Sequence, residues 1–230
     1  TAREQHRADR QRGRPVALAG HAGSRAVSLA NRVSRTSGPA AEPAAVNAPL
    51  FRRLVESLSE ERRLVVLDLG PVRPETVALL TPFRCRLEIA DLADDLPALD
   101  AETEFNALRD RAEDLLPIAR REPVDIVLCW DLLNYLQRPA LTALAERLAA
   151  RMRPGGFAHL LITYSGTTMP AKPSRFAAFA DGRFIEMPVT EARRPAPRYT
   201  PEDLGRCLKG FRSESAMLLR NGMQEFLFRA

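Results

Sequence analysis

Several residue types and patterns are scarce in this sequence of 230 residues, and each shortage narrows what the protein can do. The three cysteines, Cys85, Cys129 and Cys207, form no C-x-x-C pair, which argues against a zinc site or a disulfide framework and favours a reducing cytoplasm. No apolar run approaches the roughly 18 residues of a membrane span, and we expect no secretory signal. Metal-ligand spacing, a Ser/His/Asp arrangement and a G-x-G-x-x-G pattern are also missing, so we expect no bound metal and no NAD.

Lysine is nearly missing as well, and the net positive charge is confined to one end of the chain. Lys172 and Lys209 are the only lysines among 34 basic residues. Residues 1–48 hold eight arginines against three acidic residues, whereas residues 49–230 hold 26 basic and 26 acidic residues. The net charge of +5 therefore belongs to the first segment, and nucleic acid is not expected as a partner of the neutral remainder.

Residues 1–48 contain almost no large apolar side chains, so they cannot form a core by themselves. We interpret them as a basic, Arg-rich flexible arm and linker, followed by one domain at residues 49–230. A protein partner or another acidic surface, such as RNA or anionic lipid, would suit the arm. Its Arg-rich, acid-poor composition is also typical of an organelle transit peptide.

Apolar patterning in the domain predicts alternating strands and helices, and hence a parallel α/β sheet. Strands are predicted at residues 63–69, 86–91, 124–130 and 157–163. Helices are predicted at residues 49–58, 75–80 and 140–152.

The remaining segments carry weaker or more local signals. A short strand is expected at residues 105–108, and residues 164–198 are expected to form a long connection of a length that suits a lid. Thr200 and Pro201 predict the start of the last helix. Asn221-Gly222 between two apolar runs predicts a hairpin whose two turn residues both have positive φ.

Two fragments of the predicted sheet carry a family resemblance. Val65 to Gly70 reads as a buried strand that enters a tight turn. Val124 to Leu133 reads as a second buried strand, which a helix and Arg153-Pro154-Gly155-Gly156 follow. This order and spacing resembles class I S-adenosylmethionine-dependent methyltransferases over roughly residues 50–230. The resemblance implies a Rossmann-like methyltransferase fold, with a mainly parallel sheet, helices on both faces and a C-terminal antiparallel hairpin.

The resemblance also implies S-adenosylmethionine as cofactor, held at the strand ends. Family glycines after the first strand let the backbone approach the methionine moiety, and Asp68 and Gly70 match the start of that motif. Val72 and Pro74 stand at the next two glycine positions, so the loop is altered. Asp91 matches the family acid that accepts hydrogen bonds from the ribose hydroxyls, although a solvated turn residue is the alternative.

A third family acid, which reads the adenine amine, has no clear match. Arg111 stands at its place, and Asp110 or Asp114 could replace it after a shift of register.

Polar and aromatic side chains follow the two later strands, where open α/β sheets hold their ligands. We expect Trp130 and Asp131 at the cofactor, and Asn134, Tyr135 and Tyr164 at the substrate. The alternative buries Trp130 in the core and uses Asp131 as a helix cap. His159 is interpreted as a structural residue, and no catalytic base is assigned.

Two functions follow from these patterns. The first is a working methyltransferase whose substrate, a small molecule or a protein, is unknown. Basic residues of the long connection would favour an acidic substrate, and a solvated basic loop is the alternative. These basic residues are Arg175, Arg183, Arg193, Arg194 and Arg198. The second is a catalytically inactive, methyltransferase-like pseudoenzyme that acts as a binding or assembly subunit through its basic arm.

Overall fold

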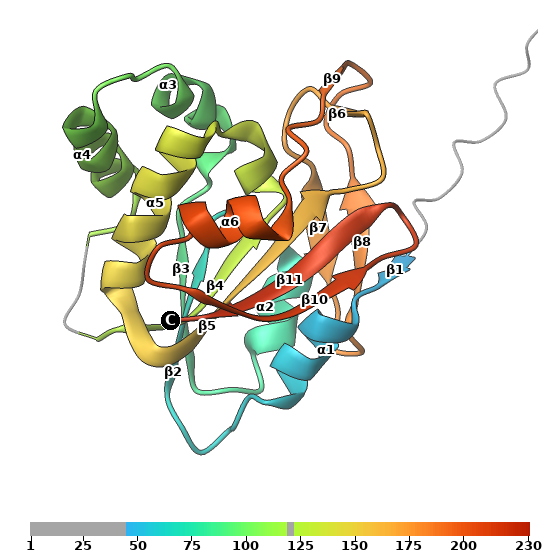
Figure 1. Ribbon diagram of the computed structural model, residues 1–230. Helices are drawn as coiled ribbons and strands as arrows, with labels where there is room; N and C mark the ends of the chain where they lie inside the picture. Colours follow the sequence, from blue (N-terminus) through green and yellow to red (C-terminus); the bar gives the residue numbers. More distant parts are fainter. Residues whose placement is uncertain (1–44, 119–121) are drawn as a thin grey trace, which may run out of the picture. The chain divides into compact units, whose positions relative to one another are not determined.

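The computed structural model describes residues 45–118 and 122–230, which are built around a six-stranded sheet (Figure 1). The strand order is β10-β11-β5-β4-β2-β3. Their bounds are β2 Leu64–Asp68, β3 Cys85–Ile89, β4 Val124–Trp130, β5 Met152–Thr163, β10 Arg212–Leu218 and β11 Met223–Arg229. Strands β3, β2, β4 and β5 are parallel, whereas β11 is antiparallel to both β5 and β10. The sheet is therefore mainly parallel and ends in a C-terminal antiparallel hairpin.

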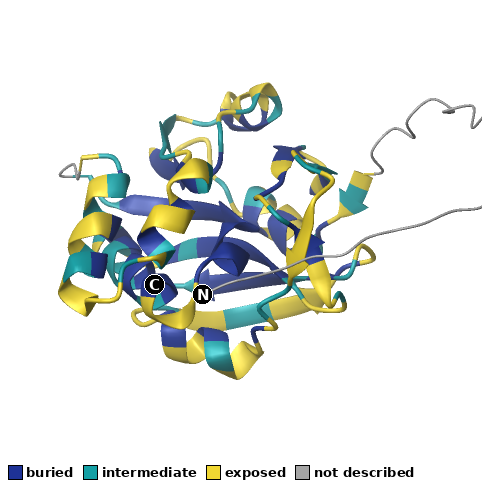
Figure 2. Ribbon diagram, turned by 90° about the horizontal axis from the view of Figure 1, so that it is seen from above, coloured by how far each residue is buried: buried dark blue, intermediate teal, exposed yellow. Residues whose placement is uncertain are grey.

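Helices cover both faces of this sheet (Figure 1). One face carries α3 Leu96–Asp100, α4 Phe105–Leu115, α5 Arg138–Arg151 and α6 Pro201–Cys207, and the other carries α1 Pro49–Glu56 and α2 Pro74–Leu80. Successive residues of β2 point to opposite faces of the sheet: Val65 packs in the core beneath α3 to α6, and Val66 packs in the core beneath α1 and α2. Figure 2 shows the central strands largely buried beneath these layers. This architecture confirms the predicted Rossmann-like methyltransferase fold.

Two short 3₁₀ turns extend the strand ends at the edge where a ligand is expected. They are η1 Leu92–Asp94 after β3 and η2 Leu132–Tyr135 after β4. No helix of the described residues exceeds 14 residues, and none has the length and hydropathy of a membrane span. Cys129 and Cys207 are buried, Cys85 is half-buried, and all three are free thiols.

The segment predicted as a long connection, residues 164–198, contains four strands. β7 Arg175–Ala178 and β8 Arg183–Met187 form a small antiparallel sheet with β1 Ala45–Asn47, while β6 Thr168–Pro170 pairs with β9 Arg193–Pro195. These strands have only three to five residues each, which is too short for an alternating pattern to distinguish them from loop in the sequence. β1 lies in the segment predicted as the arm, and the rest of that segment, residues 1–44, lies outside the described residues.

The strand predicted at residues 105–108 is wrong, because these residues begin helix α4. Leu108 and Ala112 are its buried residues, one helical turn apart, and α4 packs against α5. The apolar residues of the segment therefore follow a helical period rather than an alternating one.

The hairpin at Asn221-Gly222 is confirmed, but its turn differs from the predicted one. Only Gly222 has positive φ, at 84°, and its N–H donates to the carbonyl of Leu219 at 3.1 Å. A three-residue loop with glycine in the left-handed region at its end gives the same connection with one residue at positive φ instead of two.

Helix α1 begins without a side-chain cap of its own, since Ala48 is the N-cap residue. The carboxylate of Glu225 on β11 accepts the N–H groups of Leu50 at 3.0 Å and Phe51 at 2.7 Å. The same carboxylate lies 2.9 Å from Nε2 of His159 on β5, and both side chains are fully buried. His159 therefore has the structural place expected for it, and Glu225 caps the helix from the far end of the chain.

Candidate ligand site at the carboxyl edge of the sheet

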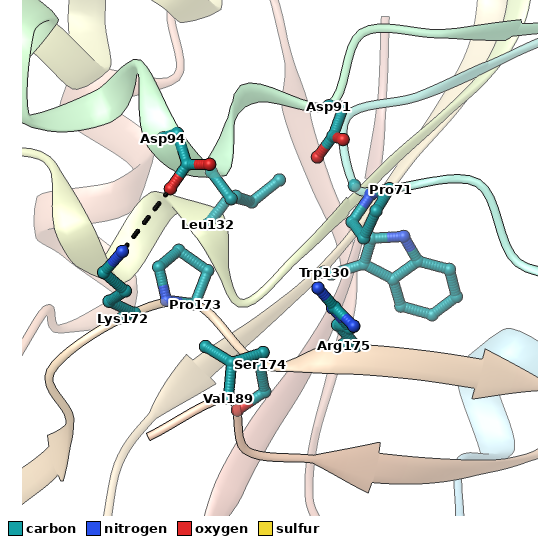
Figure 3. A pocket seen from close by; sticks show the side chains of 12 residues that line it. Pro71, Asp91, Asp94, Trp130, Leu132, Lys172, Pro173, Ser174, Arg175 and Val189 are labelled. Carbon is teal, nitrogen blue, oxygen red and sulfur yellow. Dashed lines mark ion pairs between the residues drawn. The ribbon is translucent and has the colours of Figure 1, made fainter. Parts of the chain in front are cut away.

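A cavity of about 250 Å³ lies at the carboxyl ends of β2, β3 and β4 (Figure 3). Its floor comes from the turns that follow these strands, and its roof comes from the segment of residues 172–175, which we call the strap, together with Val189. The lining residues are Gly70, Pro71, Asp91, Ala93, Asp94, Trp130, Leu132, Lys172, Pro173, Ser174, Arg175 and Val189. Three predicted cofactor residues, Gly70, Asp91 and Trp130, are therefore brought together here.

The indole of Trp130 lies directly over Gly70. Its Nε1 donates to Oδ1 of Asp68 at 2.7 Å, and the N–H of Gly70 donates to the same oxygen at 2.9 Å. A Cβ atom on Gly70 would lie 2.9 Å from Cδ1 of Trp130. A side chain at position 70 would therefore collide with the Trp130 ring, while Gly70 itself also lines the cavity.

The backbone of Trp130 is in the left-handed region, with φ at 48°, which is unfavourable for a bulky residue. Ring contacts hold it there. Phe176 on β7 stacks on the indole with centroids 5.4 Å apart and planes 6° apart, and Phe51 on α1 packs at 6.0 Å. Strain of this kind persists where surrounding contacts fix the conformation. The Trp130 ring is therefore a well-packed part of the core.

Asp68 is almost completely buried beneath this ring. Burial raises the pKa of its carboxyl to about 7, while the hydrogen bonds from Gly70 and Trp130 oppose the shift and the charge of Asp91 adds to it. Because Oδ1 already accepts two N–H groups of the protein, Asp68 stabilises the turn at Gly70 and the position of the Trp130 ring.

Asp91 differs from Asp68 in exposure and in partners. It follows β3 with φ at 47°, is exposed, and points its carboxylate toward the cavity (Figure 3). Across residues 45–118 and 122–230, its side chain forms no hydrogen bond or ion pair. Arg175 lies on the opposite wall, and Nζ of Lys172 is 3.6 Å from Oδ1 of Asp94.

Asp131 holds the strap in place. Its Oδ2 accepts the N–H of Ser174 at 3.0 Å, and Oγ of Ser174 donates to Oε1 of Glu186 at 3.2 Å. The pKa of Asp131 is raised to about 8, mainly by burial and also by the charge of Glu186, while the hydrogen bond from the Ser174 N–H opposes the shift. The structure thus places Asp131 behind the cavity wall and not among the lining residues.

Asn134 and Tyr135 also contact the protein backbone. Asn134 donates to the carbonyls of Asp131 and Leu161 and accepts the N–H of Thr163 at 2.9 Å. The hydroxyl of Tyr135 donates toward the carbonyls of Pro170 at 3.1 Å and Lys172 at 2.8 Å. Both residues thereby fix the end of β5 and the strap.

Three other sequence candidates lie away from this cavity. Tyr164 is 55% exposed and does not line it. Arg111 lies on α4, as does Asp110, which is 3.5 Å from Arg147. The roof residues Lys172, Pro173, Ser174 and Val189 were missed by sequence reasoning, since the only signal was the length of the connection that contains them.

S-adenosylmethionine does not fit these residues as a whole. The ribose side fits, because Asp91 offers an unpartnered carboxylate to hydroxyl donors. The methionine side fits less well, because the Trp130 ring takes up the space that a Cβ atom on Gly70 would occupy, although Gly70 still lines the cavity. Val72, which replaces a family glycine, is 60% exposed beside this turn. The altered loop and the Trp130 ring thus both lie at the part of the site where the family holds the methionine moiety.

Comparison with solved structures finds similar chains at low identity. The 1,6-didemethyltoxoflavin-N1-methyltransferase of Burkholderia thailandensis, solved with S-adenosylhomocysteine, has 18% identity and a TM-score of 0.42, over 78% of this chain and 77% of its own. A methyltransferase of Clostridium acetobutylicum has 12% identity and a TM-score of 0.47, over 78% and 88%. The pyocyanin biosynthetic protein PhzM has 17% identity and a TM-score of 0.43, and the match spans 78% of this chain but only 53% of PhzM.

No protein-family model and no curated protein sequence matches the chain. Because the structural likenesses have low identities and scores, the assignment of a methyltransferase-like fold rests on the strand order and on the C-terminal hairpin.

Proposed function

We propose that this protein is a catalytically inactive, methyltransferase-like binding protein. The observation that supports it is the Trp130 ring over Gly70, bonded to Asp68 and stacked on Phe176. Methyl transfer by an in-line displacement gains mainly from the position of the two reactants, so it depends on a held cofactor more than on any catalytic base. A chain whose own Trp130 ring takes up space on the methionine side of the site meets that requirement less well.

A working S-adenosylmethionine-dependent methyltransferase is the second candidate. Asp91 favours it, because its unpartnered carboxylate stands where the family holds the ribose. This function requires the Trp130 ring to leave its place over Gly70, which breaks the hydrogen bond to Asp68 and the stack on Phe176. The buried ring contacts therefore weigh against it.

Calorimetric titration with S-adenosylmethionine and S-adenosylhomocysteine separates the two candidates. We expect no detectable binding to the wild-type chain. Trp130→Ala, which empties the space over Gly70, is expected to bind more tightly than Trp130→Phe, which keeps a ring there. Micromolar binding to the wild type that is lost in Asp91→Ala but kept in Asp95→Ala contradicts the proposal and establishes the second candidate. Asp95 is the matched control because it is exposed in the same turn and does not line the cavity.

The arm supplies the binding role in this proposal. Residues 1–48 carry the whole net charge of the chain, and flexible basic segments order against acidic surfaces. Replacing the eight arginines of the arm by glutamine in the full chain is expected to abolish capture of an acidic protein partner in a pull-down, with the circular dichroism spectrum unchanged. Undiminished capture contradicts a role for the arm. A cytoplasmic location stays a prediction from cysteine usage.

A further inference from the structure

A second cavity, of about 380 Å³, lies beside the first one and shares the ion-paired Asp94 and Lys172 with its lining. It is bounded by α3, η2, the strap and β9. We propose that this second cavity binds a small carboxylate with an apolar, aromatic body, held by Arg194. Such binding is independent of S-adenosylmethionine, because neither Gly70 nor Trp130 lines this cavity.

The walls of the second cavity are mostly apolar. They are provided by Ala93 in η1, Leu96 and Pro97 in α3, Ala101 after it, and Ala171 and Pro173 near the strap. The ring of Tyr135 completes them, and its hydroxyl is already bonded to the backbone of Pro170 and Lys172. Apolar walls with few convergent polar groups are typical of sites for small organic ligands.

Arg194 is the one cationic group on these walls that has no acidic partner within the described residues. Lys172 is paired with Asp94, and the carboxylate of Asp100 accepts the N–H and the side-chain amide of Gln137. The guanidinium of Arg194 lies 5.6 Å from the centroid of the Tyr135 ring, an attractive cation–π geometry. An anion that enters the cavity therefore meets a charge that is positioned and not already neutralised.

The class of anion follows from this charge balance. A single guanidinium presents paired N–H donors that match the two oxygens of a carboxylate. A phosphate dianion would leave one negative charge facing Asp94 and Asp100, which line the same cavity. The apolar walls and the Tyr135 ring suit a flat apolar body attached to the carboxylate. These features together favour an aromatic carboxylate.

Ligand-observed NMR on the full chain with 2-naphthoate tests this site, with 2-naphthamide as the neutral analogue and acetate as the anion without an apolar body. We expect 2-naphthoate to bind and the other two to bind at least about tenfold more weakly, because one loses the charge-assisted hydrogen bonds and the other the apolar contacts. Arg194→Gln is expected to weaken 2-naphthoate by about tenfold or more.

Arg193→Gln is the matched control, because Arg193 is adjacent on β9 but donates to Thr168 and does not line the cavity. Equal binding of 2-naphthoate and 2-naphthamide, equal losses in the Arg193 and Arg194 variants, or no binding of 2-naphthoate overturns the proposal. S-adenosylmethionine binding, measured separately, bears on the proposed inactivity and not on this site.

Discussion

Asp68 and Asp91 end two adjacent parallel strands, yet one carboxylate is used by the protein and the other is open to a ligand. Asp68 is buried and accepts N–H groups from Gly70 and Trp130. Asp91 is exposed, lines a cavity and has no partner within the described residues. The carboxylate of Asp68 is therefore covered by the Trp130 ring, and the carboxylate of Asp91 is open to the cavity.

This difference shows that a fold and its cofactor site can separate. The sheet places the ends of β2 and β3 side by side, as the fold requires. A single residue at the end of β4, Trp130, then decides which carboxylate remains accessible. Evolution of such a site needs no change of topology, only a large side chain held by neighbouring rings.

The largest expected effect comes from removing the ring that covers Asp68. Trp130→Ala should lower the free energy of unfolding by about 3–5 kcal/mol, since it deletes a buried aromatic side chain. Trp130→Phe should cost only about 1–2 kcal/mol, because it keeps a ring over Gly70 and loses mainly the hydrogen bond to Asp68. Urea unfolding followed by far-ultraviolet circular dichroism measures both. Equal costs for the two variants would mean that the ring is not a packed part of the core.

A smaller effect is expected when the buried carboxyl of Asp68 ionises as the pH rises. Folding raises the pKa of Asp68 from 3.8 to about 7, so between these values the folded state holds more protons than the unfolded state. Stability from this group is therefore full below about pH 4 and is lost as the pH rises to about 7, by a few kcal/mol at most. Asp68→Asn, which cannot ionise, should show a shallower fall of unfolding free energy over this range.

The measurement for Asp68 is chemical unfolding from pH 4 to pH 8, compared between wild type, Asp68→Asn and the exposed control Asp95→Asn. Asp131 contributes a similar fall up to about pH 8 in all three proteins, so it cancels in the comparison. A pH profile of Asp68→Asn that coincides with the wild type would contradict the buried, raised pKa.

The smallest effect is expected at the open carboxylate of Asp91. Asp91→Asn should change the unfolding free energy by no more than about 0.5 kcal/mol, because the side chain is exposed and asparagine tolerates the left-handed backbone. Thermal unfolding at pH 7 measures it. A loss as large as that of Trp130→Ala would remove the contrast between the two carboxylates.

The sheet was predictable from the sequence because its central strands are continuously apolar. All seven residues of β4 and all five of β2 are buried, which leaves few alternatives to a central parallel strand. The four strands of residues 164–198 were not predictable, since strands of three to five residues are too short to show a clear period. Helix α4 was misread because the short apolar stretch at its start fits either period.

The sequence could predict at which edge of the sheet the site lies, but not how its side chains are arranged. The topology brings Gly70, Asp91 and Trp130 to one edge, as strand ends in an open sheet must meet. The sequence could not reveal that Trp130 turns over Gly70, because this depends on its positive φ and on Phe176, which is distant in the chain. It could not assign Lys172 and Arg175 to the same cavity either, because their positions follow from the strap.

The cap that Glu225 provides for α1 has a consequence for how the chain is made. Its two hydrogen bonds span 174 and 175 residues, so the cap of the first helix of the described domain forms only after residue 225 has been synthesised. Until then the amide groups of Leu50 and Phe51 lack this carboxylate, and so does the imidazole of His159. Such long-range closure slows folding, and it exposes the nascent chain to misassembly on the ribosome. A chain on a ribosome stalled before residue 225 would therefore lack the carboxylate that caps helix α1.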